Sequence, residues 1–118
     1  MPRVADYSIV TDAWVIEAAQ HTINFEIPSN IDAGSRCILG FMVDTYHLDS
    51  MNLTLHLNGV QVWTRGFPGE SERVHFFQEV IAAGVVKPGT NTLTFDTTSS
   101  DATAVQLSDV VVWWQANI

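Results

Sequence analysis

Apolar and polar residues alternate with a period of two along most of this chain, and that alternation limits the folds open to it. Residues 53–57 alternate strictly, turn at Asn58-Gly59 and return as residues 60–63. A type I′ turn needs positive φ at both central residues, and Asn-Gly supplies it most readily, so this stretch predicts a β-hairpin. The dominant period is that of strands rather than of helices.

Turn residues divide the rest of the chain into further short strands. Residues 36–46 are apolar on both faces, which predicts a central strand covered on both sides, and Gly40 within it indicates a bulge or a close backbone approach. A single helical turn is predicted at 81–84. About eight strands with turns every eight to twelve residues indicate a sandwich or barrel. The other predicted strands are 7–18 (broken near Thr11), 22–27, 73–80, 92–97 and 105–115.

The length of 118 residues fits one domain, residues 1–118, which buries about two-thirds of its unfolded surface and needs no disulfide or metal to hold a core. Cys37 is the single cysteine and stands in an apolar run, so a buried, inert thiol is expected. The first residues lack the pattern of a signal peptide, and no apolar run reaches the length of a membrane span. A cytoplasmic location is therefore predicted.

Thirteen acidic residues against five basic ones give a net charge of −8. Proteins that bind nucleic acids or anionic membranes gain affinity from lysine and arginine, so neither is predicted as a partner. Only 15% of the residues are charged, yet the chain carries four tryptophans. This combination predicts that part of the surface is hidden in a homo-oligomer.

Three motifs in the second half carry a resemblance to a known family. They are Leu-x-Leu-Asn-Gly at 55–59, Lys-Pro-Gly-x-Asn-x-Leu-x-Phe at 87–95, and a closing apolar strand. Over residues 51–115 the chain resembles the galactose-binding-like jelly rolls, which include carbohydrate-binding modules and the sugar-binding domain of family 2 glycoside hydrolases. The resemblance implies an all-β, antiparallel β-sandwich that binds glycans or serves as a non-catalytic accessory. No acidic cluster maps onto the structural calcium site frequent in those domains, so neither metal nor cofactor is predicted.

No catalytic signature stands out. The chain has no Gly-x-Ser-x-Gly elbow, no phosphate-binding loop, and no His-x-His or His-x-x-x-His spacing among its four histidines. Its carboxylates are dispersed, although four could meet on one sheet face: Asp44, Glu79, Asp96 and Asp109. Enzymatic activity is therefore not favoured. A small cyclase, isomerase or hydrolase using a His/carboxylate pair in a sandwich pocket remains an alternative.

The aromatic residues are the stronger functional lead. Trp113 and Trp114 are consecutive on a predicted strand, so their side chains point to opposite faces. Asp109 and Gln115 share the parity of Trp113, which makes Trp113 the outward one. An outward tryptophan serves as an oligomer interface, as a platform on which a sugar stacks, or as the support of a loop.

Trp63 and Arg65 are expected at a strand end where loops gather, near Tyr46 and His47. The sequence therefore predicts a non-catalytic binding or assembly module that takes a carbohydrate or small polar ligand and self-associates through an apolar sheet face. A purely structural subunit is the remaining alternative. The candidate ligand-binding residues are Trp63, Arg65, His56, His75, Tyr46, His47, Trp113 and Asp109.

Overall fold

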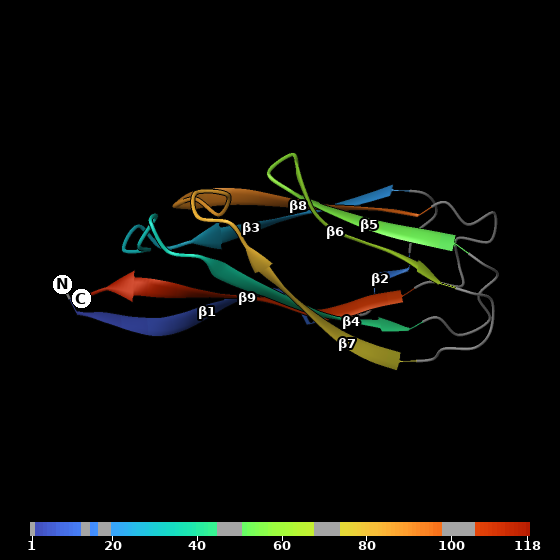
Figure 1. The fold of residues 1–118 in the computed structure, drawn as a ribbon, viewed down its shortest axis with the longest axis horizontal. Helices are drawn as coiled ribbons and strands as arrows, with labels where there is room; N and C mark the ends of the chain where they lie inside the picture. Colours follow the sequence, from blue (N-terminus) through green and yellow to red (C-terminus); the bar gives the residue numbers. More distant parts are fainter. Residues whose placement is uncertain (1, 13–14, 17–19, 45–50, 68–73, 98–105) are drawn as a thin grey trace.

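The computed structural model describes residues 2–12, 15–16, 20–44, 51–67, 74–97 and 106–118. Across these residues the regular structure is β, and two antiparallel sheets pack face to face (Figure 1). None of the described segments forms a helix able to cross a membrane. The strands in chain order are β1 (Arg3–Thr11), β2 (Val15–Ile16), β3 (Gln20–Ile27), β4 (Cys37–Asp44), β5 (Met51–Leu57), β6 (Val60–Phe67), β7 (Val74–Ile81), β8 (Gly89–Thr97) and β9 (Gln106–Asn117).

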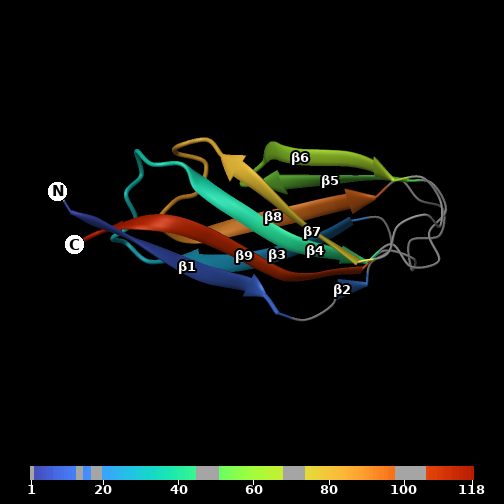
Figure 2. The same cartoon turned by 60° about the horizontal axis from the view of Figure 1, so that its bottom comes forward.

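One sheet has the order β1-β9-β4-β7, with the short β2 also paired to β9, and the other has the order β3-β8-β5-β6. They are called here the β9 sheet and the β8 sheet. Strand β9 lies between β1 and β4, so the closing apolar strand is central. The two ends of the chain lie side by side, since Arg3 pairs with Asn117 (Figure 2). The predicted antiparallel β-sandwich is confirmed.

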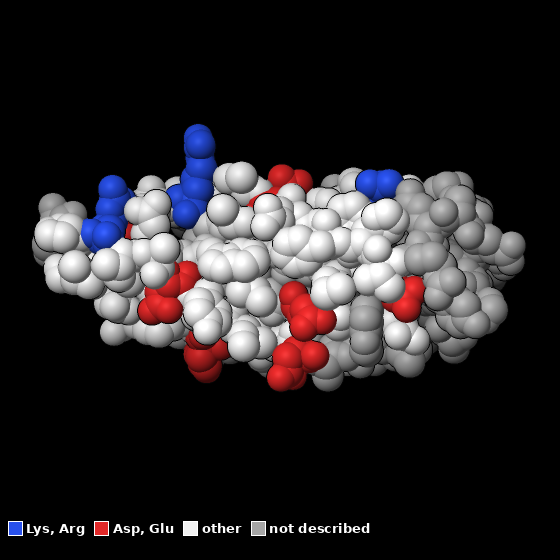
Figure 3. Space-filling view, turned by 90° about the horizontal axis from the view of Figure 1, so that it is seen from below, with Lys and Arg blue, Asp and Glu red and all other residues white. Residues whose placement is uncertain are grey.

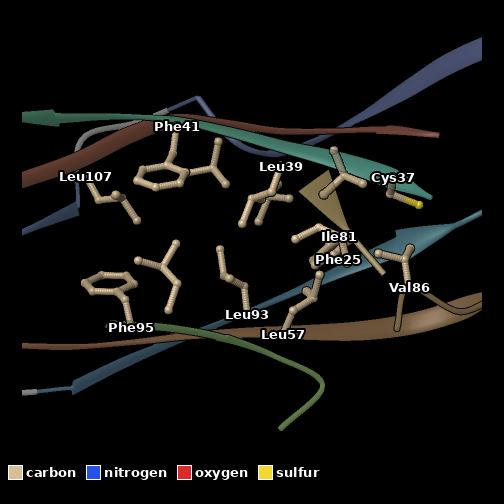
Figure 4. Packing of buried hydrophobic residues seen from close by; sticks show 14 of the residues in the cluster. Phe25, Cys37, Leu39, Phe41, Leu57, Ile81, Val86, Leu93, Phe95 and Leu107 are labelled. Carbon is tan, nitrogen blue, oxygen red and sulfur yellow. The ribbon is translucent and has the colours of Figure 1, made fainter. Parts of the chain in front are cut away.

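The core fills the space between the sheets because every second side chain of each strand points inward. Leu39, Phe41 and Val43 of β4 are fully buried against the β8 sheet, from which Leu93 and Phe95 point back toward them (Figure 4). Burial of each such side chain stabilises the fold by about 1.5–3 kcal/mol. The alternation seen in the sequence is thus the pattern of the core.

The two turn motifs behind the family resemblance meet in space. Asn58 and Gly59 have φ angles of 51° and 82°, which confirms the type I′ hairpin. The Asn58 amide donates to Asn91 Oδ1 at 2.7 Å, and Asn58 Oδ1 accepts from the Thr92 backbone at 2.8 Å. Asn91 is fully buried and also bonds the Lys87 backbone at both its N–H (2.9 Å) and its carbonyl (2.7 Å). These asparagines therefore clamp two turns together, which is a structural role.

Two details of the predicted elements differ from the structure. Strand β4 is covered on one face only: Ile38 on its outer face remains 40% exposed. The outward apolar residues of β4 belong to a sheet surface rather than to a second core layer, so that prediction is wrong. Residues 82–85 form a turn closed by the Val85 N–H and the Ala82 carbonyl at 3.3 Å, with φ of 86° at Gly84, instead of a helical turn.

Candidate functional site

The adjacent tryptophans of β9 occupy the two faces that their parity predicts. Trp114 is 3% exposed between the sheets and donates its indole N–H to Ser8 Oγ at 3.2 Å. Trp113 is partly exposed on the outer face of the β9 sheet. It is therefore the indole available to a ligand or a partner.

Gly40 explains how Trp113 lies on that face. A Cβ atom at Gly40 would come within 2.5 Å of Trp113 Cζ3 and 2.7 Å of Phe76 Cζ. Both rings therefore pack directly against the backbone of Gly40. The pairing of β4 with β9 also shifts between Gly40 and Met42. The predicted close approach at Gly40 is confirmed, whereas the extra residue of the register shift stands on β9, between Ser108 and Val111.

Beside Trp113 lies a shallow, open hollow of about 170 Å³. Its walls come from β1, from the start of β4 and the residue before it, and from the end of β9, which the strand register brings level with one another. This is smaller than the roughly 300–1,000 Å³ of enclosed ligand pockets, and it has room for one ring rather than a chain of rings. The lining residues are Ala5, Arg36, Ile38, Trp113, Trp114 and Gln115.

A polar network stands at the rim of the hollow. Arg3 Nη1 donates to Asp32 Oδ2 at 2.6 Å and to Ser35 Oγ at 2.7 Å, while Ser35 Oγ lies 2.5 Å from Asp32 Oδ2 and 3.4 Å from Gln115 Oε1. The hydrogen bond from Ser35, followed by that from Arg3, lowers the pKa of Asp32 below its usual value. Asp32 is therefore held as a carboxylate. Its partner Ser35 also contacts Gln115, which lines the hollow.

Arg36 differs from Arg3 because its guanidinium has no hydrogen-bond or ion-pair partner within the described part of the chain. It lines the hollow together with the Trp113 indole and the Gln115 amide. The arrangement offers an aromatic wall with guanidinium and amide groups at its margin. Sequence reasoning missed Arg36, because its place beside Trp113 depends on the register of β4 against β9. Gln115 was visible only as a residue sharing the parity of Trp113.

A second cluster closes the margin of the sandwich between β6 and β7. The Trp63 ring packs against Phe41 and Phe77, with centroids 4.9 Å and 5.1 Å away. The Arg65 guanidinium lies over Phe77 at 5.1 Å, and His75 lies 6.0 Å from the same ring. The structure thus brings Trp63 and Arg65 together with His75 around the Phe77 ring. Trp63 plugs the core here, and Arg65 covers the ring of Phe77 by a cation–π contact.

The other sequence candidates do not join either cluster. His56 lies on the outer face of the β8 sheet, where its Nδ1 is 3.5 Å from Asp96 Oδ2. Asp109 is exposed at a kink of β9, with φ of 49°, and accepts a hydrogen bond from Ser108 Oγ at 2.8 Å. Tyr46 and His47 lie outside the described residues.

His56 and His75, both candidates for ligand binding, belong to different sheets, so they are not on neighbouring strands. Asp96 is on β8, whereas Asp44, Glu79 and Asp109 are on strands of the β9 sheet, so the four carboxylates do not share a face. The error has one cause: alternation gives the parity of a residue within its strand but not the sheet to which the strand belongs.

The described residues contain no group of three or more His, Cys, Asp or Glu side chains that could hold a metal ion. Cys37 is a buried free thiol, and burial raises its pKa. It is therefore protonated at neutral pH and a poor nucleophile, as the sequence predicts.

No family model matches this sequence, and comparison with curated proteins finds no match. Among solved structures, the chain is similar to dimeric latent PorU from Porphyromonas gingivalis, with a TM-score of 0.73 and 11% identity over 99% of this chain and 13% of that one. It therefore spans only a small part of PorU.

Two smaller proteins are covered over most of their length. The sugar-binding C-terminal domain of EclA gives a TM-score of 0.53 with 9% identity, over 95% of this chain and 79% of that one. A family 35 carbohydrate-binding module from an environmental isolate gives 0.52 with 15% identity, over 94% and 90%. At these identities the likeness concerns the fold alone, and it is consistent with the galactose-binding-like β-sandwich that the resemblance in the sequence implies.

Proposed function

We propose that this chain is a non-catalytic carbohydrate-binding module that takes one sugar ring in the hollow beside Trp113. The observation that supports this most directly is the combination in one shallow site of a partly exposed indole, a guanidinium without a partner among the described residues, and an amide, from Trp113, Arg36 and Gln115. The fold similarity to a sugar-binding domain and a carbohydrate-binding module agrees with it.

The chemistry of the hollow suits a sugar because a pyranose ring has one apolar C–H face and a polar edge. The C–H face packs on the negative face of an indole, while the hydroxyl groups at the edge need hydrogen-bond donors and acceptors. Trp113 provides the first surface, and Arg36 and Gln115 provide donors at its margin. The open shape lets the rest of a glycan extend into solvent.

The proposal includes self-association through the outer apolar face of the β9 sheet. A catalytic alternative has one supporting observation, the His56–Asp96 pair at 3.5 Å. Its side chains are 33% and 35% exposed on the open face of the β8 sheet, whereas the hollow lies on the other sheet. A pair so placed cannot act on a ligand held beside Trp113.

The test is a binding panel of soluble mono- and oligosaccharides, followed by calorimetry and by NMR shift mapping. We expect Trp113→Ala to weaken binding by at least about tenfold, since loss of a stacked ring removes its contact area. Trp113→Phe keeps an aromatic surface and retains much of the affinity, and Arg36→Gln weakens binding by a few-fold. Thr64→Ala, on the outer face of the β8 sheet, is the matched control and leaves affinity unchanged.

A panel without any binder would refute the carbohydrate proposal. Binding that survives Trp113→Ala but is lost in Arg65→Ala would move the site to the β6–β7 margin and disprove the role of the hollow.

A further inference from the structure

The outer face of the β9 sheet carries a continuous apolar patch, which extends from the β1 edge to the β7 edge. Six large side chains of this patch keep between 40% and 58% of their surface exposed. Between them lie the partly buried side chains of Met42, Val111 and Trp113. The six exposed residues are Tyr7, Ile9, Ile38, Val74, Phe76 and Val80.

The strand register makes these residues neighbours. Tyr7 pairs with Trp113, which pairs on its other side with Ile38, and Ile38 pairs in turn with Val80. A second row joins Met42 to Phe76. Opposed residues on neighbouring strands have Cβ atoms about 4.5–5.5 Å apart, so the side chains of each row touch.

Glycine in the middle of the patch lets two rings lie close to the backbone. The rings of Trp113 and Phe76 lie against Gly40, where any Cβ atom would collide with them. An apolar sheet face is the surface on which a second sheet packs, with the two sheets about 10 Å apart. A narrow peptide or a small ligand would leave most of such a surface wet.

Basic groups keep to the margin of this face. In Figure 3 the centre of the face is without Lys and Arg, the basic side chains lie along its upper edge, and most acidic ones lie below its middle, one of them close to it. Asp109 is at the β9 kink and Asp44 is at the end of β4, while Gln78, between Phe76 and Val80, is neutral. Two copies of a chain with a net charge of −8 repel one another, so they approach closely only through an uncharged surface of this kind.

The exposed apolar area is a large part of what a stable dimer buries. Taking about 150–200 Å² for each large apolar side chain, the six exposed residues present roughly 500 Å². The partly buried residues between them add to this area. A standard protein interface buries about 800 Å² on each partner, and the core of a homodimer interface is its most apolar part. The patch supplies such a core.

We propose that a second copy of this chain packs its own apolar patch against this one, sheet face to sheet face, about a two-fold axis. A two-fold interface uses the same surface on both subunits, and an uncharged apolar patch is complementary to itself. The inference deepens the proposed function, since it names the surface and the partner for the self-association included there. The hollow lies on the same face and shares Trp113 and Ile38 with the patch, so a sugar stacked on Trp113 and a second copy on the patch exclude one another.

The test is sedimentation velocity over a wide concentration series, with a glutamate placed at either edge of the patch. Ile9→Glu changes β1 and Phe76→Glu changes β7, at residues that are 56% and 48% exposed. We expect a dimer for the unmodified chain and at least an about 100-fold weaker association for each variant, because each buries an unpaired charge. Val60→Glu, at a 47% exposed site on β6 of the other sheet, is the matched control and remains dimeric.

Each other outcome overturns the inference. A chain that stays monomeric throughout the series would mean that another partner covers the patch, such as a different protein or an adjoining domain. A dimer that withstands both glutamates would use another surface. Circular dichroism spectra and thermal melts of each variant exclude a monomer that arises from misfolding, and Ile9→Ser is a milder second variant for that case.

Glycan binding measured on Ile9→Glu separates this inference from the carbohydrate proposal. Ile9 does not line the hollow. Because the dimer covers Trp113, a monomeric Ile9→Glu that binds glycan at least as tightly as the unmodified chain supports both. A glutamate-sensitive dimer whose monomeric variant binds no glycan supports the interface alone, and an unmodified chain that is monomeric and binds glycan supports the carbohydrate proposal alone.

Discussion

The two outer faces of this sandwich are built from antiparallel strands of similar length over one shared core, yet their chemistry is opposite. The β8 sheet presents threonines that bond one another across strands, Thr22 with Thr94 at 3.3 Å and Thr54 with Thr64 at 2.9 Å. The β9 sheet presents Tyr7, Ile9 and Phe76 instead. Because the fold requires only the inward faces to be apolar, the apolarity of this outer face calls for a functional explanation.

The largest expected effect tests whether the apolar outer face is a surface or a hidden second core. Trp114→Ala should lower the free energy of unfolding by about 3–5 kcal/mol, since Trp114 is 3% exposed between the sheets. Trp113→Ala, one residue away and partly exposed, should cost the isolated chain only about 1–2 kcal/mol. Guanidinium denaturation at low protein concentration measures both. Equal losses would contradict the description of this face as a surface.

The next effect concerns the close packing of two rings against the backbone of the apolar face. Gly40→Ala places a methyl group within 2.5 Å of the Trp113 ring, so we expect a loss of about 1–3 kcal/mol or an outward shift of both rings that weakens association. Gly34→Ala is the matched control, since nothing lies within 4 Å of the place that its methyl group would take. Thermal melts and sedimentation distinguish the two results. An unchanged melt together with unchanged association would show that the contact at Gly40 has no role.

The sequence alone predicts the strands and the inward or outward parity of their side chains, because alternation and Asn-Gly turn chemistry are local. Trp113 and Trp114 could be assigned to opposite faces in this way. The partners across a sheet are not local. The grouping of Arg36 with Trp113 and Gln115 follows from the register of three strands that are distant in sequence, and it could not be read from spacing.

The same limit explains the histidines and the margin cluster. Parity alone could not assign His56 and His75 to different sheets, since strand order is set by packing of the whole chain. Trp63 and Arg65 were expected to stand at a rim open to ligand. Instead the Trp63 ring fills the space between β6 and β7 and contacts Phe41. A large apolar ring at an open margin is stabilised more by filling the core than by facing solvent.

A smaller effect tests the polar face. Replacing both members of the Thr54–Thr64 pair by valine removes one hydrogen bond and makes part of the β8 sheet apolar. Because the pair is near the surface, we expect a change in stability of no more than about 1 kcal/mol and no new association. Denaturation and sedimentation measure this. Dimerisation through the altered β8 sheet would show that two valines are enough to create an interface. The large extent of the apolar patch on the β9 sheet would then not be what determines which face associates.

The smallest effect concerns the Arg3–Asp32 ion pair at the rim of the hollow. Among the described residues, the outer face of the β8 sheet has no ion pair that involves an arginine. The pKa of Asp32 is lowered from its ordinary 3.8, so the unfolded chain takes up this proton before the folded chain does. The stability contributed by Asp32 is complete above the ordinary value and is lost as the pH falls through the lowered one. Asp32→Asn should remove this part of the acid dependence.

The hydrogen bond from Ser35 is the largest cause of the lowered Asp32 pKa, so Ser35→Ala should raise that pKa more than Arg3→Gln does, as measured by ¹³C NMR titration of the carboxyl group. The reverse order would mean that the Arg3 ion pair, rather than the Ser35 hydroxyl, holds the rim beside Gln115 in place.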